Sequence, residues 1–399
     1  MDSPRSANVS LDMSSVSEAN PPAETPRLVR WREALRPTPR FRRQVLRAII
    51  VAVIFLAFLA GLAALFGISI LQYTLAGFRL SSIVIVAAIG LTVIYGIRGF
   101  ANFAYGDLMT LGAYVALFVN MNLALSLIWG AIVSFLALAF VGILLEVLVF
   151  ARLEGRGPVP PIVASVGVGL IIQNGINWGG TTQQWIFRLP AIAEIPIVPG
   201  IGFHWIRDFG TFVVGIGFML SVHILLTYTN LGKAMRATAD NLELAKATGI
   251  NTKRVTYAAW ALSCSFASTA GILLGLIGVL SPTMGFNVLL LIFAAVIVGG
   301  IGSPYGAVLG GLVIGLSQEM SVPLLIWLER PDVLHLEHST AYKVAIPFIV
   351  MIGVLIFRPW GIAGRPPAFA RRVFFMERIT KVLGRRGDAR EQVRGEGGG

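Results

Sequence analysis

The sequence has few charged residues for its length, and this scarcity decides the class of protein. Only 13% of the 399 residues are Asp, Glu, Lys or Arg, whereas soluble domains carry about a quarter. Hydrophobic residues make up 56%, and the mean hydropathy is +0.78. The run Ala48–Ile68 has 21 residues without a polar side chain, enough at about 1.5 Å per residue to cross a hydrocarbon core of about 30 Å. Such long runs do not alternate, which excludes a closed β-barrel. The sequence therefore predicts an all-α polytopic membrane protein.

Cysteine and histidine are also scarce, which excludes several chemistries. Cys264 is the single cysteine, so the chain forms no intramolecular disulfide, and its apolar surroundings in the sequence predict a packing role. The four histidines do not have the spacing of metal ligands. His335 and His338, with Glu337 between them, share a polar loop in which we expect them to be solvated. No metal or cofactor is expected in this chain.

Motifs of catalysis are missing as well. No GxxxxGK[ST] phosphate-binding loop occurs, and no carboxylate pair or Ser/His/Asp arrangement stands out. We therefore expect a chain without enzymatic activity and without an ATPase site. A transport reaction driven by ATP would take its energy from another subunit.

Hydropathy and helix breakers predict ten apolar segments, and hence about eight to ten transmembrane or re-entrant helices. The two shortest segments, residues 288–300 and 307–320, either span the membrane or re-enter it. The ten segments are Ala48–Ile68, Leu80–Ile97, Leu108–Leu123, Leu125–Phe150, Pro161–Trp178, Thr211–Tyr228, Val255–Leu280, Val288–Gly300, Ala307–Met320 and Ala341–Phe357.

The positive charge is unevenly distributed, and its distribution predicts the topology. The net charge is +12, and 27 of the 32 Lys and Arg residues fall in the two terminal arms and in alternate loops. Because cytosolic loops carry the excess of Lys and Arg, these regions are predicted to be cytosolic. Both termini and residues 231–254 therefore lie in the cytosol in this prediction.

Composition divides the chain into three regions. Residues 1–47 form a polar arm rich in Pro, Ser and Arg, without the early apolar core of a signal peptide. We expect this arm to be disordered in the cytosol. Residues 48–358 form the membrane domain, and residues 359–399 form a basic cytosolic tail. The arginines before the first span suit contacts with lipid headgroups, and no nucleic-acid partner is expected.

The longest polar interruption in the second half of the chain is LGKAMRATADNLELAKATGINTKR, residues 231–254, called the polar segment below. Small and helix-forming residues such as Ala245 dominate it. Asp240 is predicted to cap a helix start, with Glu243 three residues later as in a capping box. Gly249 is predicted to stop the helix. The result is a short amphipathic cytosolic helix, which needs a lipid or protein surface to cover.

Polar residues also cluster at helix breaks in IYGIRGFANFAYGDLMTLGAY, residues 94–114. Ionisable groups at bilayer depth cost about 2.5–3.5 kcal/mol on insertion scales, so they usually face a cavity or a partner. Arg98 and Asp107 therefore either face a cavity or a partner, or lie wet at the cytosolic interface. For Asn102 and Tyr105 we expect a cavity or a structural hydrogen bond.

A second polar group lies in PIVASVGVGLIIQNGINWGG, where Gln173 and Asn177 share a helix face beside Asn174. Amides in a membrane helix hold helices together or line a passage, and the sequence leaves both open. Glu146 lies near the cytosolic end of its span, where it either extends to the interface or pairs with Arg152.

Small residues recur at a spacing of four near the end of the membrane domain. This pattern lets helix backbones approach closely, so we expect helix packing there. The glycines concerned are Gly302, Gly306 and Gly310, followed by Gly311 and Gly315.

Three of these stretches resemble the LivH-type permeases of ATP-binding-cassette importers for branched-chain amino acids. GLTVIYGIRGFANFAYGDLMTLGAY resembles the signature of that family, and LGKAMRATADNLELAKATGIN resembles its cytoplasmic coupling segment. FAAVIVGGIGSPYGAVLGGLVIGL resembles its C-terminal half, and the whole resemblance covers roughly residues 70–358. In the wider importer family the coupling segment reads Glu-Ala-Ala, three residues, then Gly. Glu243, Ala245 and Gly249 fit this spacing, whereas Leu244 replaces the first Ala, and Tyr105 stands where members usually have His.

The resemblance implies a permease subunit of the inner membrane. Its partners would be ATP-binding subunits, a second permease of the LivM type and an external solute-binding protein. The coupling site would contain Asp240, Glu243, Ala245 and Gly249.

The expected solutes are branched-chain amino acids or related small amides. We expect them to cross beside polar side chains that interrupt apolar runs, because an apolar solute needs a mostly apolar wall with few polar groups. These side chains are Asn102, Tyr105, Gln173 and Asn174.

The alternative function is an ion-coupled secondary transporter of small polar solutes. That class favours carboxylates in mid-span for proton or Na⁺ coupling, and the spans here are poor in them. A membrane anchor of a signalling complex is a third hypothesis, but an anchor would not need spans broken by glycine.

Overall fold

The computed structural model describes residue 61 and residues 69–180, 183–188, 195–198, 201–203, 208–329 and 338–364. All but Gly61 belong to the unit Leu62–Gly399, one of two into which the chain divides, and only this unit is considered below. The predicted arm 1–47, the predicted first span and most of the basic tail lie outside the described residues. The same holds for His335 and Glu337.

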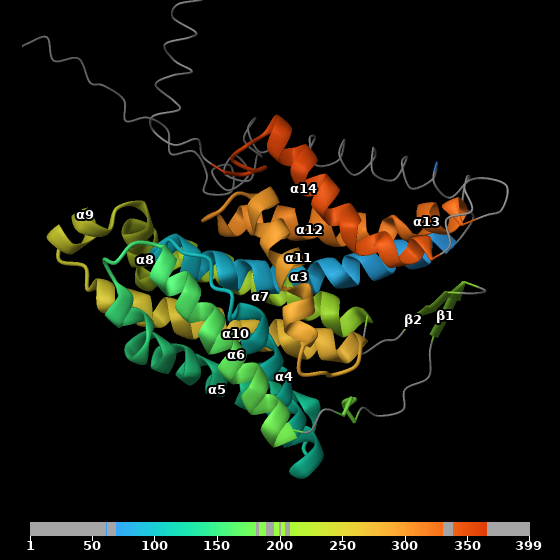
Figure 1. Ribbon diagram of the computed structural model, residues 1–399, viewed down its shortest axis with the longest axis horizontal. Coiled ribbons are helices and arrows are strands. Elements are labelled where there is room, and N and C mark those ends of the chain that lie inside the picture. Colours follow the sequence, from blue (N-terminus) through green and yellow to red (C-terminus); the bar gives the residue numbers. More distant parts are fainter. Residues whose placement is uncertain are drawn as a thin grey trace, which may run out of the picture. The chain divides into compact units, whose positions relative to one another are not determined.

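Helices dominate the described part of the chain (Figure 1). The strands form one small antiparallel hairpin, in which Ile195 pairs with Phe203. In chain order the elements are α3 (Ser69–Arg98), α4 (Tyr105–Asn122), α5 (Leu127–Leu148), η2 (Phe150–Leu153), α6 (Val159–Gly180), β1 (Ile195–Val198), β2 (Ile201–Phe203), α7 (Gly210–Tyr228), α8 (Asn230–Asp240), α9 (Leu242–Ala247), α10 (Thr252–Ile277), α11 (Met284–Gly299), α12 (Pro304–Met320), α13 (Val322–Leu328), η4 (Ser339–Val344) and α14 (Ala345–Phe357).

Seven helical stretches among the described residues are long and apolar enough to cross a membrane, which confirms the predicted all-α polytopic class. They include Pro304–Leu328, where α12 and α13 follow one another, so the segment predicted at 307–320 belongs to a stretch of spanning length. The other short segment is α11, an apolar helix of 16 residues. α3 begins at Ser69, well before the predicted Leu80, and is 30 residues long.

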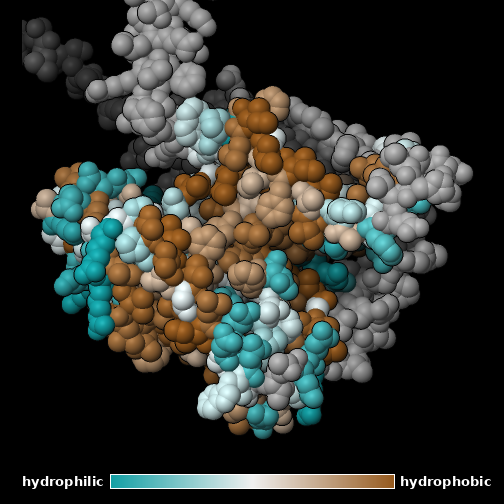
Figure 2. Space-filling model, in the orientation of Figure 1, coloured by the Kyte–Doolittle hydropathy of each residue, from teal (hydrophilic) through white to brown (hydrophobic). Residues whose placement is uncertain are grey.

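The core is built around α3, which packs against α12, α10, α7 and α11. Side chains such as Ile83, Ile89 and Leu91 of α3 are almost completely buried. Cys264 is buried in the same core, as its predicted packing role requires. The outward faces of α5, α6, α7 and α14 instead expose large apolar side chains, as expected for helices that face lipid or a second membrane subunit. In Figure 2 such hydrophobic residues cover much of the visible face.

Glycines allow the closest helix contacts. A Cβ at Gly306 or Gly310 would collide with the backbone of α11, and one at Gly311 or Gly315 would collide with α3. These four positions confirm the predicted packing role. The prediction for Gly302 is wrong, because it lies in the turn before α12 with φ +82° and open space around it. The spacing of four alone does not distinguish a turn glycine from a helix-packing one.

Candidate functional site

The polar segment forms two helices, α8 and α9, rather than the single predicted helix. At the start of α8 the Thr229 hydroxyl accepts a hydrogen bond from the Gly232 N–H at 3.0 Å. At the start of α9 the Asn241 side chain accepts one from the Leu244 N–H at 3.0 Å. The prediction that Asp240 caps a helix start is therefore wrong, because Asp240 is the last residue of α8. The backbone is extended at Asn241, so this residue takes the capping position.

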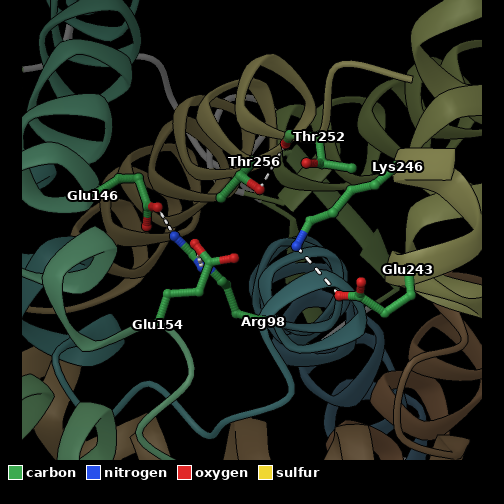
Figure 3. A network of polar contacts seen from close by, with 7 residues as sticks. All are labelled: Arg98, Glu146, Glu154, Glu243, Lys246, Thr252 and Thr256. Atoms are coloured by element: carbon green, nitrogen blue, oxygen red, sulfur yellow. Dashed lines mark hydrogen bonds and ion pairs between the residues drawn. The ribbon is translucent and has the colours of Figure 1, made fainter. Parts of the chain in front are cut away.

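Glu243 does not close a capping box either. It follows Asn241 by two residues, and its carboxylate accepts a hydrogen bond from the Lys246 ammonium at 3.3 Å (Figure 3). The Glu243 and Lys246 side chains are 82% and 45% exposed. Leu244, between them, is 61% exposed, so α9 presents a charged and apolar outward face.

Gly249 ends α9 as predicted. Its φ is +83°, and its N–H donates to the Lys246 carbonyl at 3.1 Å. The N–H of Ile250 donates to the Ala245 carbonyl at 3.1 Å. These two bonds are those of a Schellman motif, which satisfies the last carbonyls of a helix and favours glycine at the left-handed position.

The inner face of the polar segment is packed against the membrane helices. Met235, Thr238 and Ala245 are buried, so Ala245 faces inward and is not available to a partner protein. At Gly232, α8 crosses the end of α7 so closely that a Cβ would meet the Leu225 and Leu226 backbone. α8 also contacts α3 and α10. The segment is thus an ordered platform joined to three membrane helices, rather than a free loop.

An ion-pair network lies at the end of α3, next to this platform (Figure 3). Arg98 pairs with Glu146 of α5, and with Glu154 at 3.0 Å. The side chains of Arg98 and Glu146 are only 11% and 1% exposed. Of the two alternatives for Arg98, the structure therefore shows pairing with a partner rather than a wet position. The suggested pairing of Glu146 with Arg152 is wrong. Arg98 and Glu146 are 48 residues apart, and the only signal in the sequence is that each is a lone charge near the end of an apolar run.

The break between α3 and α4 is partly buried, with Gly99 exposed and Phe100, Asn102 and Ala104 buried. Asn102 and Tyr105 are both 0% exposed. The Asn102 side-chain oxygen accepts from the Ala104 N–H at 3.1 Å, and the Tyr105 hydroxyl donates to the Ser263 carbonyl of α10 at 3.4 Å. Gly90 of α3 leaves room for this hydroxyl. Of the two predicted roles, the structure shows the structural hydrogen bond for both residues.

Asp107 is also buried, so the wet position is not the one that it takes. It is 5% exposed in the first turn of α4, and one of its oxygens has no hydrogen-bond partner among the described residues. The other oxygen lies so close to Gly169 of α6 that a Cβ added to this glycine would collide with it. The carboxylate therefore faces α6 instead of solvent.

The amides of α6 lie apart from the α3–α4 break. The break touches α6 at Ser165, whose hydroxyl accepts from the Phe103 N–H at 3.0 Å. Gln173 is eight residues further along α6, or about 12 Å at 1.5 Å per residue. Asn174 is exposed and donates to the Leu170 carbonyl of its own helix, while Gln173 is half-buried. The structure therefore does not bring the four predicted passage residues together within this chain.

Taken together, these features define a class. The chain is a multi-pass α-helical membrane protein, in which an ordered two-helix segment packs on the ends of the central helices and keeps one face exposed. A family model described as "Branched-chain amino acid transport system / permease component" matches residues 73–355, and the chain belongs to this family.

Curated relatives agree with this assignment. The chain is 30% identical over 313 residues to the high-affinity branched-chain amino acid transport system permease protein LivH of Salmonella typhimurium, a match that covers 74% of this chain and 96% of the relative. The identity and coverage are the same for LivH of Escherichia coli K12. For BraD of Pseudomonas aeruginosa the identity is 28% over 311 residues, covering 74% and 96%. Family membership and the seven apolar stretches identify a permease component of the inner membrane, and the ion-coupled alternative is not supported.

Proposed function

We propose that this chain is the membrane-spanning subunit of an ATP-driven importer that translocates branched-chain amino acids or related small amides. The observation that carries the proposal is the ordered platform α8–α9 in a chain of this permease family. Its exposed face at Glu243 and Leu244 suits a groove on an ATP-binding subunit, while its buried face contacts α3, α7 and α10. A displacement of the platform would therefore reach the membrane helices directly.

The proposal includes the other components of such an importer. No GxxxxGK[ST] loop occurs in the sequence, so ATP is hydrolysed by separate ATP-binding subunits. A second permease of the LivM type and an external solute-binding protein complete the assembly, and lipids surround it. The charge distribution supports a cytosolic location for both termini and the platform. In this proposal the arm 1–47 and the tail 359–399 lie on that side of the membrane domain 48–358.

The predicted passage residues take different positions in this proposal. Asn102 and Tyr105 hold the α3–α4 break in place through buried hydrogen bonds. Gln173 and Asn174 belong to α6, a helix with much of its surface exposed. They are available to a passage formed between this chain and the second permease.

The test is reconstitution in proteoliposomes with the ATP-binding subunits, the second permease and the binding protein. We expect ATP-dependent uptake of radiolabelled leucine by the full assembly, and no uptake by this chain alone under a proton or Na⁺ gradient. Uptake by the chain alone would refute the importer assignment.

The exposed face of the platform at Glu243 and Leu244 is tested in the same system. Leu244→Glu should remove ATPase co-purification and uptake together, because it places a charge in an apolar contact. Leu244→Met should preserve both, because it keeps a side chain of similar volume and polarity. Normal co-purification of the Leu244→Glu variant would show that α9 is not the contact.

A further inference from the structure

A pocket of about 670 Å³ is lined in part by α8 of the platform and does not include Glu243 or Leu244 of α9. It is lined by the last turns of α3, the end of α7, α8, the turn between α11 and α12, and residues 363–364. None of the residues discussed above for solute passage lines it. The nature of its lining points to the ligand.

Two cations of α8 line this pocket. Lys233 and Arg236 are three residues apart, which places them on one face of the helix. Both are exposed, and neither forms an ion pair with another described residue. Asp240, one turn further on, also lines the pocket and leaves a net charge of +1. This net positive charge favours an anionic ligand.

The N-terminus of α12 faces the same space. Gly302, Ser303 and Pro304 line the pocket, and the Ser303 hydroxyl caps the helix through the Gly306 N–H at 3.1 Å. α12 is 17 residues long, so its positive dipole end adds to the charge of the two cations. This feature alone would not define a site.

Thr92 of α3 also contributes to the wall of the pocket and is 1% exposed. The pocket therefore lies between α8 and the central helix, and a ligand in it would contact both.

The surroundings of the pocket favour an amphiphile over a soluble anion. Tyr305 lines the pocket, and its hydroxyl forms a hydrogen bond with His223 of α7 at 2.9 Å. Next to this contact, Leu220 and Ile224 of α7 and Leu309 of α12 are 53%, 54% and 44% exposed. An acyl chain can follow these apolar side chains while its headgroup occupies the pocket.

We propose that this pocket binds the phosphate headgroup of an anionic phospholipid of the cytosolic leaflet, with its acyl chains along the outer faces of α7 and α12. Basic pockets between membrane helices on the cytosolic side are suited to such headgroups. The inference does not depend on which solute is transported. A bound lipid here would contact both α8 and α3, and so would stiffen the joint between the platform and the central helix.

The experiment is a native mass spectrometry titration of the purified full-length chain with dioleoyl-phosphatidylglycerol and, separately, with dioleoyl-phosphatidylcholine. We expect phosphatidylglycerol to bind more tightly. Lys233→Gln combined with Arg236→Gln should weaken its binding about 25-fold, because a cation near an anionic lipid contributes about 1 kcal/mol, or about fivefold.

The matched control is Lys253→Gln combined with Arg254→Gln, which removes the same charge from the other end of the polar segment, outside the pocket. This variant should bind phosphatidylglycerol like the wild type. Melting temperatures equal to that of the wild type establish that the variants are folded. Lipid affinities are compared only between variants that meet this condition.

Four results would overturn the proposal. The first is equal affinity for the two lipids, and the second is an equal loss in the control variant. The third is displacement of phosphatidylglycerol by millimolar inorganic phosphate, which would assign the pocket to a soluble anion. The fourth is undiminished lipid binding by the Lys233/Arg236 variant together with lost ATPase co-purification, which would assign these cations to the ATPase interface.

Discussion

At the residue scale, Gly249 is the position where a single side chain has the clearest predicted effect. Its φ of +83° lies in the left-handed region, which costs other residues roughly 1–2 kcal/mol and β-branched residues more. Gly249→Val should therefore disrupt the Schellman motif, shift α9 and abolish ATP-driven uptake without reducing membrane insertion. The measurement is leucine uptake at matched membrane levels. Gly249→Asn is the control, because Asn tolerates this conformation, and it should retain most of the uptake. Normal uptake by the valine variant would show that the geometry of this turn has no part in coupling.

A second prediction at the residue scale concerns the buried ion pair of Arg98 and Glu146. Removing one member of a buried ion pair leaves the other charge unpaired and costs about 3–5 kcal/mol. Glu146→Ala should therefore lower the unfolding temperature of the purified chain strongly. Glu154→Ala should lower it little, because the Glu154 side chain is 49% exposed and such pairs contribute within about 1 kcal/mol. Replacing both members by Arg98→Met and Glu146→Leu should recover much of the lost stability. Equal effects of the two glutamate variants would contradict the assigned geometry.

These residues also show where sequence information ends. A helix cap in the polar segment is predictable, but Asp240 and Asn241 are neighbouring residues that both cap well. Which of them caps depends on where α8 ends, and that is set by the packing of Met235 and Thr238 against other helices. The partner of Arg98 is likewise chosen by how α3 and α5 meet, which no local pattern encodes. Gly249 could be predicted because its role needs only the backbone around it.

At the element scale, the contact between α11 and α12 depends on glycine. The Cα of Gly310 lies so close to α11 that an added Cβ would meet the Ala295 carbonyl and come within 2.7 Å of the Gly299 nitrogen. Gly310→Ala should therefore force the helices apart and cost about 1–3 kcal/mol, as overpacking does. The measurement is thermal unfolding of the purified chain. Gly217→Ala on α7 is the matched control, because an added Cβ there meets nothing within 4 Å. Equal unfolding temperatures for the two variants would rule out tight packing at Gly310.

Helix elements were predicted well because the membrane imposes a simple requirement on the sequence. Every backbone group at bilayer depth needs an internal hydrogen bond, so a long apolar run must be helical. The ends of the helices are less determined by hydropathy. α3 extends to Ser69 through a stretch that includes Gln72, Tyr73 and Arg79. Arg79 forms an ion pair with Asp208 at 2.6 Å, a contact between residues 129 positions apart.

At the scale of the whole molecule, the charge distribution predicts which face of the membrane each loop occupies. With 27 of the 32 basic residues on one side, the platform α8–α9 should be cytosolic and residues 183–188 external. Cys264, the single native cysteine, is 0% exposed, so introduced cysteines can be labelled with little background. Gln184→Cys and Ala247→Cys both lie at exposed positions, and the chain is expressed without its partners so that the platform is uncovered. An impermeant maleimide added to intact spheroplasts should label Gln184→Cys only, and Ala247→Cys should react once the membrane is opened. Labelling of Ala247→Cys in intact spheroplasts would show that the topology is the inverse of the predicted one. It would also place the platform where no ATP-binding subunit can reach it.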